Sequence, residues 1–263
     1  MRNRRLIAVA ALVAALGIPF AAMAQKPPVP QGQGAPVTVN GAPWQSGNYW
    51  VNYDEQLLVD FANLARYRAE DLQLRSKDPH RVVFLGDSIT EGWKLKTSFP
   101  GKPYVNRGIS GQTTPQILLR FRQDVIDLHP RAVVILAGTN DLAGNTGPMT
   151  LEDIEGNLES MAQLARENHI GVVLCSVLPT VHYSWRPELP NPAPRIAALN
   201  HWLQAHAASE HYVYVNYYAA MKDDAGAMKR GLSSDGVHPL PAGYAVMAPL
   251  AQAGIDAALQ HTR

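Results

Sequence analysis

The chain has 263 residues with 23 basic and 22 acidic side chains, which gives a formal net charge of +1. Such a balance provides no basic patch of the kind that nucleic-acid-binding proteins use, so nucleic acid is not expected as a partner. The single cysteine, Cys175, lies in the apolar run IGVVLCSVL. One cysteine excludes an intramolecular disulfide, and its apolar setting predicts a buried, inert thiol.

The first 24 residues have the pattern of a signal peptide. Three arginines precede an apolar run at residues 6–18, and the triplet AMA at 22–24 is of the small-x-small type that signal peptidases recognise. This run is too short to span a bilayer core of roughly 30 Å, which disfavours an uncleaved anchor. We therefore expect cleavage after Ala24, a periplasmic or secreted protein, and no stable membrane insertion after cleavage.

The rest of the chain is predicted to be a linker and one domain. Residues 25–48 are rich in Pro, Gly and Gln, a composition typical of a flexible or extended segment. Residues 49–263 contain no internal repeat and are of a size that one α/β domain can have.

Apolar patterns along this domain predict alternating helices and strands. Helical spacing of apolar residues over 54–75 predicts a helix before the first strand. Several of the runs that follow are apolar on consecutive residues, as in strands covered on both faces of a parallel sheet. The predicted strands are the runs at residues 82–85, 104–109, 132–137, 171–178 and 212–217.

Helix boundaries can also be predicted. Thr114 is expected to cap a helix that has Pro115 at its first position. Thr150 and Asp153 have the spacing of a capping box, and Pro241 is expected to begin the last helix. A further proline, Pro249, lies among the apolar residues of that helix, and we expect the helix to end or kink there.

Polar segments lie where the predicted strands end, and ligands of open parallel sheets bind at that edge. GDS follows the first strand, NRGISG accompanies the end of the second and GTND follows the third. DGVHP precedes the last helix. These segments occupy residues 86–88, 106–111, 138–141 and 235–239.

Together these segments provide the groups that acyl transfer requires. Ser88 would be the nucleophile, at a turn where its own N–H can also face an oxyanion. Asp235 can hold one nitrogen of His238, which leaves the other nitrogen as a base. Gly108 would let a second backbone N–H approach the substrate, and the Asn140 side chain would be a third donor.

GDSITEG, NRGISGQ, GTND and DGVHP resemble the four sequence blocks of the SGNH hydrolases, also called the GDSL esterase and lipase superfamily, in the same order. The resemblance implies a three-layer α/β/α sandwich with a five-stranded parallel sheet in the flavodoxin-like order 2-1-3-4-5. It implies ester hydrolysis through an acyl-serine, without metal or cofactor. It also implies a triad of Ser88, Asp235 and His238, and an oxyanion hole of Ser88, Gly108 and Asn140. The first block reads GDSI in place of GDSL, which leaves the serine intact.

Each segment alone has an ordinary interpretation. GDS and GTND are common turn sequences, and an Asp-x-x-His pair is common on surfaces. Their shared location at one sheet edge favours the catalytic interpretation. The remaining histidines are expected to be structural or solvated, since no group of residues has convincing metal-ligand spacing.

The loop at residues 179–194 carries His182, Tyr183 and Trp185 beside the predicted site. These side chains could contact a substrate or simply anchor the loop, and Trp93 could be either core or pocket wall. The first-choice substrates are short-acyl, especially acetyl, esters of carbohydrates. The alternatives are a lysophospholipase or thioesterase of the same family, or a carbohydrate O-acyltransferase. A non-catalytic binding module should lack a triad residue, and here none is missing.

Overall fold

The computed structural model describes residues 38–39, 42–43, 60–74 and 78–261. The predicted signal peptide lies outside these residues, as does most of the predicted linker. Within that linker, β1 (Thr38–Val39) pairs with β2 (Ala42–Pro43) in antiparallel fashion. Among the described helices, none is both long enough and apolar enough to cross a bilayer.

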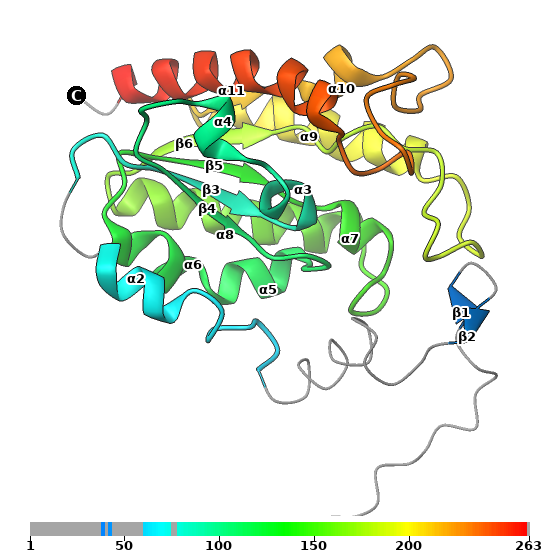
Figure 1. Ribbon diagram of the computed structural model, residues 1–263, viewed down its shortest axis with the longest axis horizontal. Helices are drawn as coiled ribbons and strands as arrows, with labels where there is room; N and C mark the ends of the chain where they lie inside the picture. The colour runs from blue at the N-terminus through cyan, green and yellow to red at the C-terminus, as the bar shows by residue number, and fades with distance from the viewer. Residues whose placement is uncertain (1–37, 40–41, 44–59, 75–77, 262–263) are drawn as a thin grey trace, which may run out of the picture. The chain divides into compact units, whose positions relative to one another are not determined.

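The domain is built on a five-stranded sheet in which every pair of neighbours is parallel (Figure 1). Its spatial order is β4-β3-β5-β6-β7. Numbered along the chain within this sheet, that is the order 2-1-3-4-5, so the predicted topology is confirmed. The strands are β3 (Val82–Gly86), β4 (Tyr104–Gly108), β5 (Ala132–Leu136), β6 (Gly171–Cys175) and β7 (Val213–Val215).

Helices cover both faces of this sheet because successive strand residues point in opposite directions. Val83 and Leu85 of β3 belong to one apolar core and Val82 and Phe84 to the other. Figure 1 shows α4 and α11 on one side of the sheet and α5, α6 and α8 on the other. The first core receives α5 (Thr114–Leu119), α6 (Phe121–Asp124), α8 (Leu151–Glu167) and α9 (Ala193–Ser209). The second receives α3 (Ser88–Glu91), α4 (Leu95–Ser98), α10 (Tyr217–Met221) and α11 (Pro241–His261).

Three short helices complete the described domain. They are α2 (Arg68–Leu74), which packs on α6, α7 (Thr139–Leu142), and a 3-10 turn, η2 (Ile126–Leu128). The sequence predicts a helix over residues 54–75. In the described part of this range the helix begins only at Arg68, because residues 60–67 form turns. Asn63 has φ +53°, a left-handed conformation that an α-helix does not contain.

Two other helix predictions need correction. The N-cap of α5 is Thr113, so Pro115 is at the second helical position. Of the predicted end or kink at Pro249, the end is wrong, because the last helix continues through this residue to His261. Its buried face, which includes Met247 and Ile255, packs on the sheet and offsets the hydrogen bond that proline removes. The Thr150 capping box of α8 is confirmed.

The register of the sheet aligns the polar segments. Gly86, the last residue of β3, pairs with Gly108 of β4 and with Leu136 of β5. The GDS, NRGISG and GTND segments consequently leave the sheet at the same edge.

Trp93 is a core residue of the α11 side, with 3% of its surface exposed. Its ring stacks on Tyr244 at a centroid distance of 5.3 Å and meets Phe84 edge-on at 5.4 Å. The indole N–H donates to Ser98 Oγ over 2.9 Å. Of the two predicted roles, the packing therefore favours core.

Replacing this side chain should mainly affect stability. We expect Trp93→Ala to lower the free energy of unfolding by about 3–5 kcal/mol, because the cavity cannot collapse fully. Urea denaturation followed by circular dichroism measures the change. Leu119→Ala, at an exposed apolar side chain of α5, is the control and should change stability by less than about 0.5 kcal/mol. Full stability of Trp93→Ala with loss of activity would instead make Trp93 part of the site.

Candidate active site

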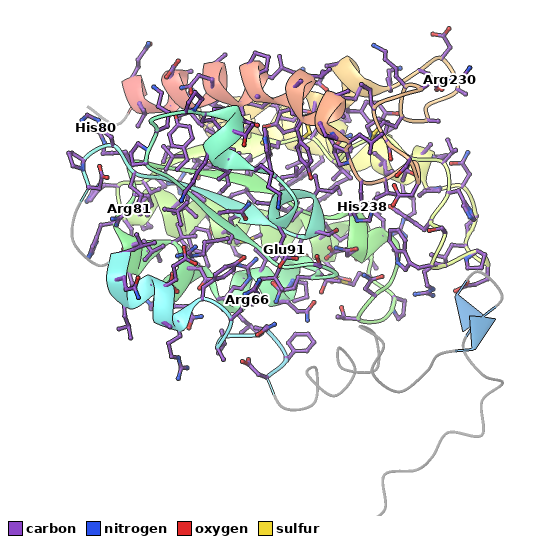
Figure 2. All side chains as sticks on the ribbon, viewed as in Figure 1. Arg66, His80, Arg81, Glu91, Arg230 and His238 are labelled. Atoms are coloured by element: carbon purple, nitrogen blue, oxygen red, sulfur yellow. The ribbon has the colours of Figure 1, made fainter. Side chains whose placement is uncertain are left out.

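A chain of hydrogen bonds connects the three predicted triad residues. Ser88 is the first residue of α3, directly after the buried N-cap Asp87. Ser88 Oγ lies 2.9 Å from His238 Nε2, and His238 Nδ1 lies 2.6 Å from Asp235 Oδ2. Because a carboxylate can only accept, the ring hydrogen is assigned to Nδ1, which leaves Nε2 to accept from the serine hydroxyl. Figure 2 shows His238 at the end of the sheet opposite to His80 and Arg81.

The turn between residues 233 and 238 positions both the base and its carboxylate. Asp235 Oδ1 accepts the backbone N–H groups of Val237 and His238 over 2.9 and 2.8 Å. Partial burial would raise the pKa of Asp235, but the bonds from His238 and Val237 lower it to about 2. The carboxylate is therefore ionised at neutral pH. Further along the chain, Tyr244 of α11 donates its hydroxyl to the carbonyl of Ile89, over 2.8 Å.

Two of the three predicted oxyanion donors lie on the short helices that follow β3 and β5. The N–H of Ser88 belongs to the first turn of α3, where no intrahelical acceptor exists. Asn140 is buried in α7, four residues after the Leu136 that pairs with Gly86. One hydrogen of its Nδ2 is donated to the Gln112 carbonyl over 2.9 Å, and an amide nitrogen carries a second hydrogen.

Gly108 has a different structural role from the predicted one. Its N–H already donates to Asn106 Oδ1 over 2.8 Å. A Cβ at position 108 would lie 2.1 Å from the backbone nitrogen of Glu91, so glycine is needed there for α3 to approach β4. Gly111, with φ +77°, is linked to Asn140 through Asn145, whose Nδ2 donates to the Gly111 carbonyl over 3.1 Å and to Asn140 Oδ1 over 3.0 Å.

Sequence reasoning missed a buried arginine beneath the site. Arg120, the C-cap residue of α5, donates to the Gly86 carbonyl over 2.8 Å and to Gln112 Oε1 over 2.6 Å. Asp124, one helical turn later, pairs with Arg120 at 2.7 Å. The same guanidinium thus connects the end of β3 with Gln112, whose carbonyl accepts from Asn140. In sequence, an Arg and an Asp four residues apart indicate only a surface ion pair.

A second missed contact fixes the loop after β4 to α3. Glu91 Oε2 accepts both the N–H and the hydroxyl of Ser110, the former over 2.9 Å. The other oxygen of Glu91 pairs with Arg66 at 3.1 Å. Figure 2 shows Glu91 and Arg66 near each other below the sheet end.

Comparison with known proteins agrees with this geometry. The pattern of the GDSL-like lipase/acylhydrolase family matches residues 84–246, which is more than half of the chain. The chain belongs to this family. As an SGNH hydrolase, it also resembles a GDSL-like lipase structure from Bacteroides thetaiotaomicron, with 44% identity and a TM-score of 0.73, covering 75% of this chain and 98% of the other.

Two curated relatives are more distant. The chain is 31% identical to the esterase TesA of Pseudomonas aeruginosa over 174 residues, 60% of this chain and 79% of TesA. It is 33% identical to the uncharacterized lipoprotein YqeF of Bacillus subtilis over 119 residues, 38% of this chain. The match spans about half of YqeF, 49% of its length.

The residues predicted to contact substrate in this GDSL-like protein have different environments. Tyr183 is buried, and its hydroxyl lies 3.1 Å from Thr139 Oγ1, so it anchors the loop. His182 is exposed. Trp185 is half-buried, with its ring centroid 6.2 Å from that of His238. Of the three, Trp185 is the side chain that adjoins the triad.

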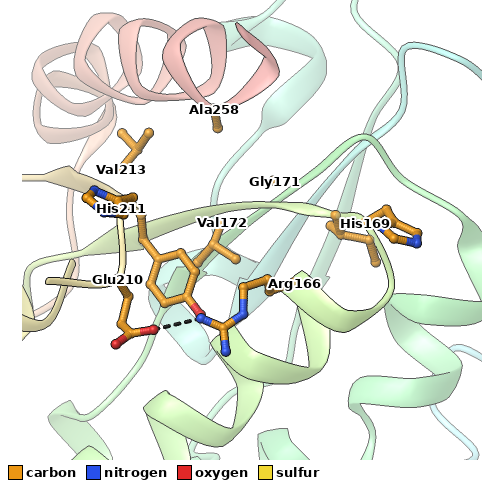
Figure 3. Close-up of a pocket in the computed structure, with 10 residues that line it drawn as sticks. Arg166, His169, Gly171, Val172, Glu210, His211, Val213 and Ala258 are labelled. Carbon is orange, nitrogen blue, oxygen red and sulfur yellow. Dashed lines mark hydrogen bonds and ion pairs between the residues drawn. The ribbon is translucent and has the colours of Figure 1, made fainter. Parts of the chain in front are cut away.

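Outside this site, the described residues offer the cysteine, the possible metal ligands and a further cavity for comparison. Burial raises the pKa of the Cys175 thiol to about 12, consistent with the predicted inert cysteine. In the described part of the chain, no three His, Cys, Asp or Glu side chains cluster as metal ligands. A cavity of about 520 Å³ lies where β6 and β7 begin, at the opposite ends of the strands from Ser88. Figure 3 shows residues that line it. Its Arg166 is paired with Glu210 at 2.6 Å.

Two buried carboxyls lie close to Ser88, the predicted nucleophile. Burial raises the pKa of Asp87 to about 7; the Ile89 N–H and the His238 charge oppose that rise, whereas Asp141 adds to it. Burial likewise raises the pKa of Asp141 to about 6, against the bonds that it accepts from Thr114. At neutral pH, the backbone under Ser88 is therefore next to a carboxyl that is close to its titration midpoint.

This buried acid should make stability depend on pH. Unfolded aspartate has a pKa of about 4, so folding takes up a proton on Asp87 between about pH 4 and about pH 7. The contribution of Asp87 to stability therefore falls as pH rises through this window, and Asp141 acts in the same direction. Asp87→Asn keeps an acceptor for the Ile89 N–H and should flatten the decline. Urea denaturation at several pH values between about 4 and about 7 measures the free energy of unfolding of both proteins. Parallel pH dependence of this free energy in the variant and the wild type would refute the assignment of the decline to Asp87.

Proposed function

We propose that this protein is a serine esterase that hydrolyses carboxylic esters through an acyl-serine intermediate. The hydrogen-bonded chain from Ser88 through His238 to Asp235 carries the proposal. As Ser88 Oγ attacks the ester carbonyl, its proton passes to His238 Nε2. Collapse of the tetrahedral intermediate expels the alcohol, which takes that proton. Water, deprotonated by His238, then attacks the acyl-enzyme, and the carboxylic acid leaves with Ser88 restored.

The developing oxyanion needs hydrogen-bond donors that are already in place. We assign the N–H of Ser88 and the free Nδ2 hydrogen of Asn140 to this role. Gly108, the third predicted donor, is left out of this role, because its N–H is committed to Asn106. No metal or cofactor takes part in this sequence of steps.

For the substrate, we propose a small-molecule or glycan ester with a short acyl group, most often acetyl on carbohydrate. Trp185 beside His238 supports this assignment, because an aromatic face next to the base can pack against a sugar ring. His182, exposed on the same loop, offers a polar contact. Tyr183 is assigned to the loop anchor and not to the substrate.

We further propose that the protein is exported. The arginine-rich start, the apolar run at residues 6–18 and the AMA triplet at 22–24 support it. One curated relative is named a lipoprotein, which agrees with an exported family member.

Removing the nucleophile should abolish turnover. We expect Ser88→Ala to lower kcat by roughly 10⁴-fold or more and to eliminate labelling by a fluorophosphonate probe. The measurements are hydrolysis of a chromogenic acetate and mass spectrometry of the labelled protein. Ser209→Ala, at an exposed serine at the C-terminal end of α9, is the matched control and should retain both properties. Labelling that persists in Ser88→Ala would identify another nucleophile.

Acyl length should separate the candidate activities. We expect acetyl and propionyl esters of one chromogenic alcohol to have higher kcat/KM than the decanoyl ester, and acetylated sugars to be deacetylated. A strong preference for the decanoyl ester would favour a lysophospholipase or thioesterase. Acetyl transfer to an added glycan that outpaces hydrolysis would favour an O-acyltransferase.

A further inference from the structure

The indole of Trp185 makes a contact whose direction is fixed by chemistry. Its Nε1–H donates to Asn145 Oδ1 over 3.0 Å. An indole nitrogen can only donate, so the oxygen of the Asn145 amide must face Trp185 and its nitrogen must face away. The usual uncertainty over which end of an amide is oxygen is thereby removed at Asn145.

The nitrogen of Asn145 is fully used by the active-site loops. Nδ2 donates to Asn140 Oδ1 over 3.0 Å and to the Gly111 carbonyl over 3.1 Å. Its backbone N–H also donates to the Asn140 carbonyl over 3.0 Å. Asn145 therefore joins Asn140 of α7, the loop after β4 and the loop of Trp185.

The orientation of Asn140 follows from these contacts. Its oxygen accepts from Asn145, and its nitrogen donates to the Gln112 carbonyl over 2.9 Å. A flipped amide would place nitrogen against nitrogen at Asn145 and oxygen against oxygen at Gln112, with two buried bonds lost. The unflipped amide is the one that keeps an N–H for an oxyanion.

We infer that Asn145 is a positioning residue that holds the Asn140 amide as an oxyanion donor, and that Trp185 sets its direction. The inference rests on the proposed esterase function for its kinetic consequence and goes beyond it in linking the substrate loop to the oxyanion hole. Trp185 adjoins His238 and is proposed to contact the substrate. Through Asn145, it also keeps the NH₂ group of Asn140 pointing toward the oxyanion. A substrate that displaces Trp185 would thus weaken oxyanion stabilisation.

The kinetic test compares Asn145→Asp with wild type. Aspartate keeps the acceptor for Trp185 but replaces both N–H donors with an oxygen that repels Asn140 Oδ1. Loss of one oxyanion donor costs about 10² to 10³-fold in kcat, so we expect a fall between about 10-fold and that limit. KM should change little, because the oxyanion contact is made in the transition state.

A double-variant cycle separates positioning from general damage. Asn140→Ala should lower kcat strongly in the wild-type background and add little to Asn145→Asp, because the donor is already misdirected. Multiplicative losses would overturn the proposal. Asn168→Asp makes the same chemical change at an exposed asparagine after α8 and should leave kcat and KM unchanged.

A second measurement does not need turnover. In protein labelled with ¹⁵N-asparagine, the Asn140 side-chain NH₂ signal is identified by its absence in Asn140→Asp. This signal should shift or broaden in Asn145→Asp, and to a lesser extent in Trp185→Phe, which keeps an aromatic ring but removes the indole N–H. It should not change in Asn168→Asp. An unchanged Asn140 signal in both site variants would refute the inference, whether or not the wild-type protein hydrolyses esters. Absence of ester hydrolysis by the wild-type protein would refute only the proposed function.

Discussion

The active-site edge depends on the parallel pairing of β3 with both of its neighbours. Gly86 is level with Gly108 on one side and with Leu136 on the other, so three loops leave the sheet at one height. The closeness of α3 to β4 follows from the same pairing, since only glycine at position 108 leaves room for the backbone of Glu91. A shift of one strand by one residue would move its loop out of line with the other two and turn each of its side chains from one core to the other.

Within this frame, the polar groups are held by buried bonds that few alternative arrangements could satisfy. Arg120 bonds both the Gly86 carbonyl and Gln112, and Gln112 in turn accepts from Asn140. Each of these groups is buried, and an unmatched donor or acceptor there would cost about 1–3 kcal/mol. These bonds hold the groups in fixed positions, and such prior placement is what electrostatic stabilisation of a transition state requires.

Much of this arrangement could be predicted from the sequence. Consecutive apolar runs gave the strands, and the four polar segments identified Ser88, Asp235 and His238, which the structure brings within hydrogen-bond distance. Gly108 illustrates the limit: a glycine at a strand end suggests a close approach, but the sequence does not say whether substrate or another helix makes it. Asn145 was missed because an asparagine five residues after Asn140 has no pattern of its own until the loop of Trp185 folds against it.

The helix ends show the same limit. Capping at Thr150 is local and was predicted correctly, whereas continuation of α11 through Pro249 depends on packing against distant strands. Long-range contacts of this kind leave no periodic signal near the proline itself.

The position of His238 relative to Ser88 is determined by two attachments and not one. His238 meets Ser88, and six residues later Tyr244 bonds the carbonyl of Ile89, the next residue of α3. Two links to adjacent residues resist rotation of the C-terminal segment about α3 as well as its withdrawal. Because Asp235 is bonded to His238 on the same turn, a motion of that turn as one body keeps the carboxylate and the imidazole together. Such a motion changes the distance from the imidazole to Ser88, which lies on a different element.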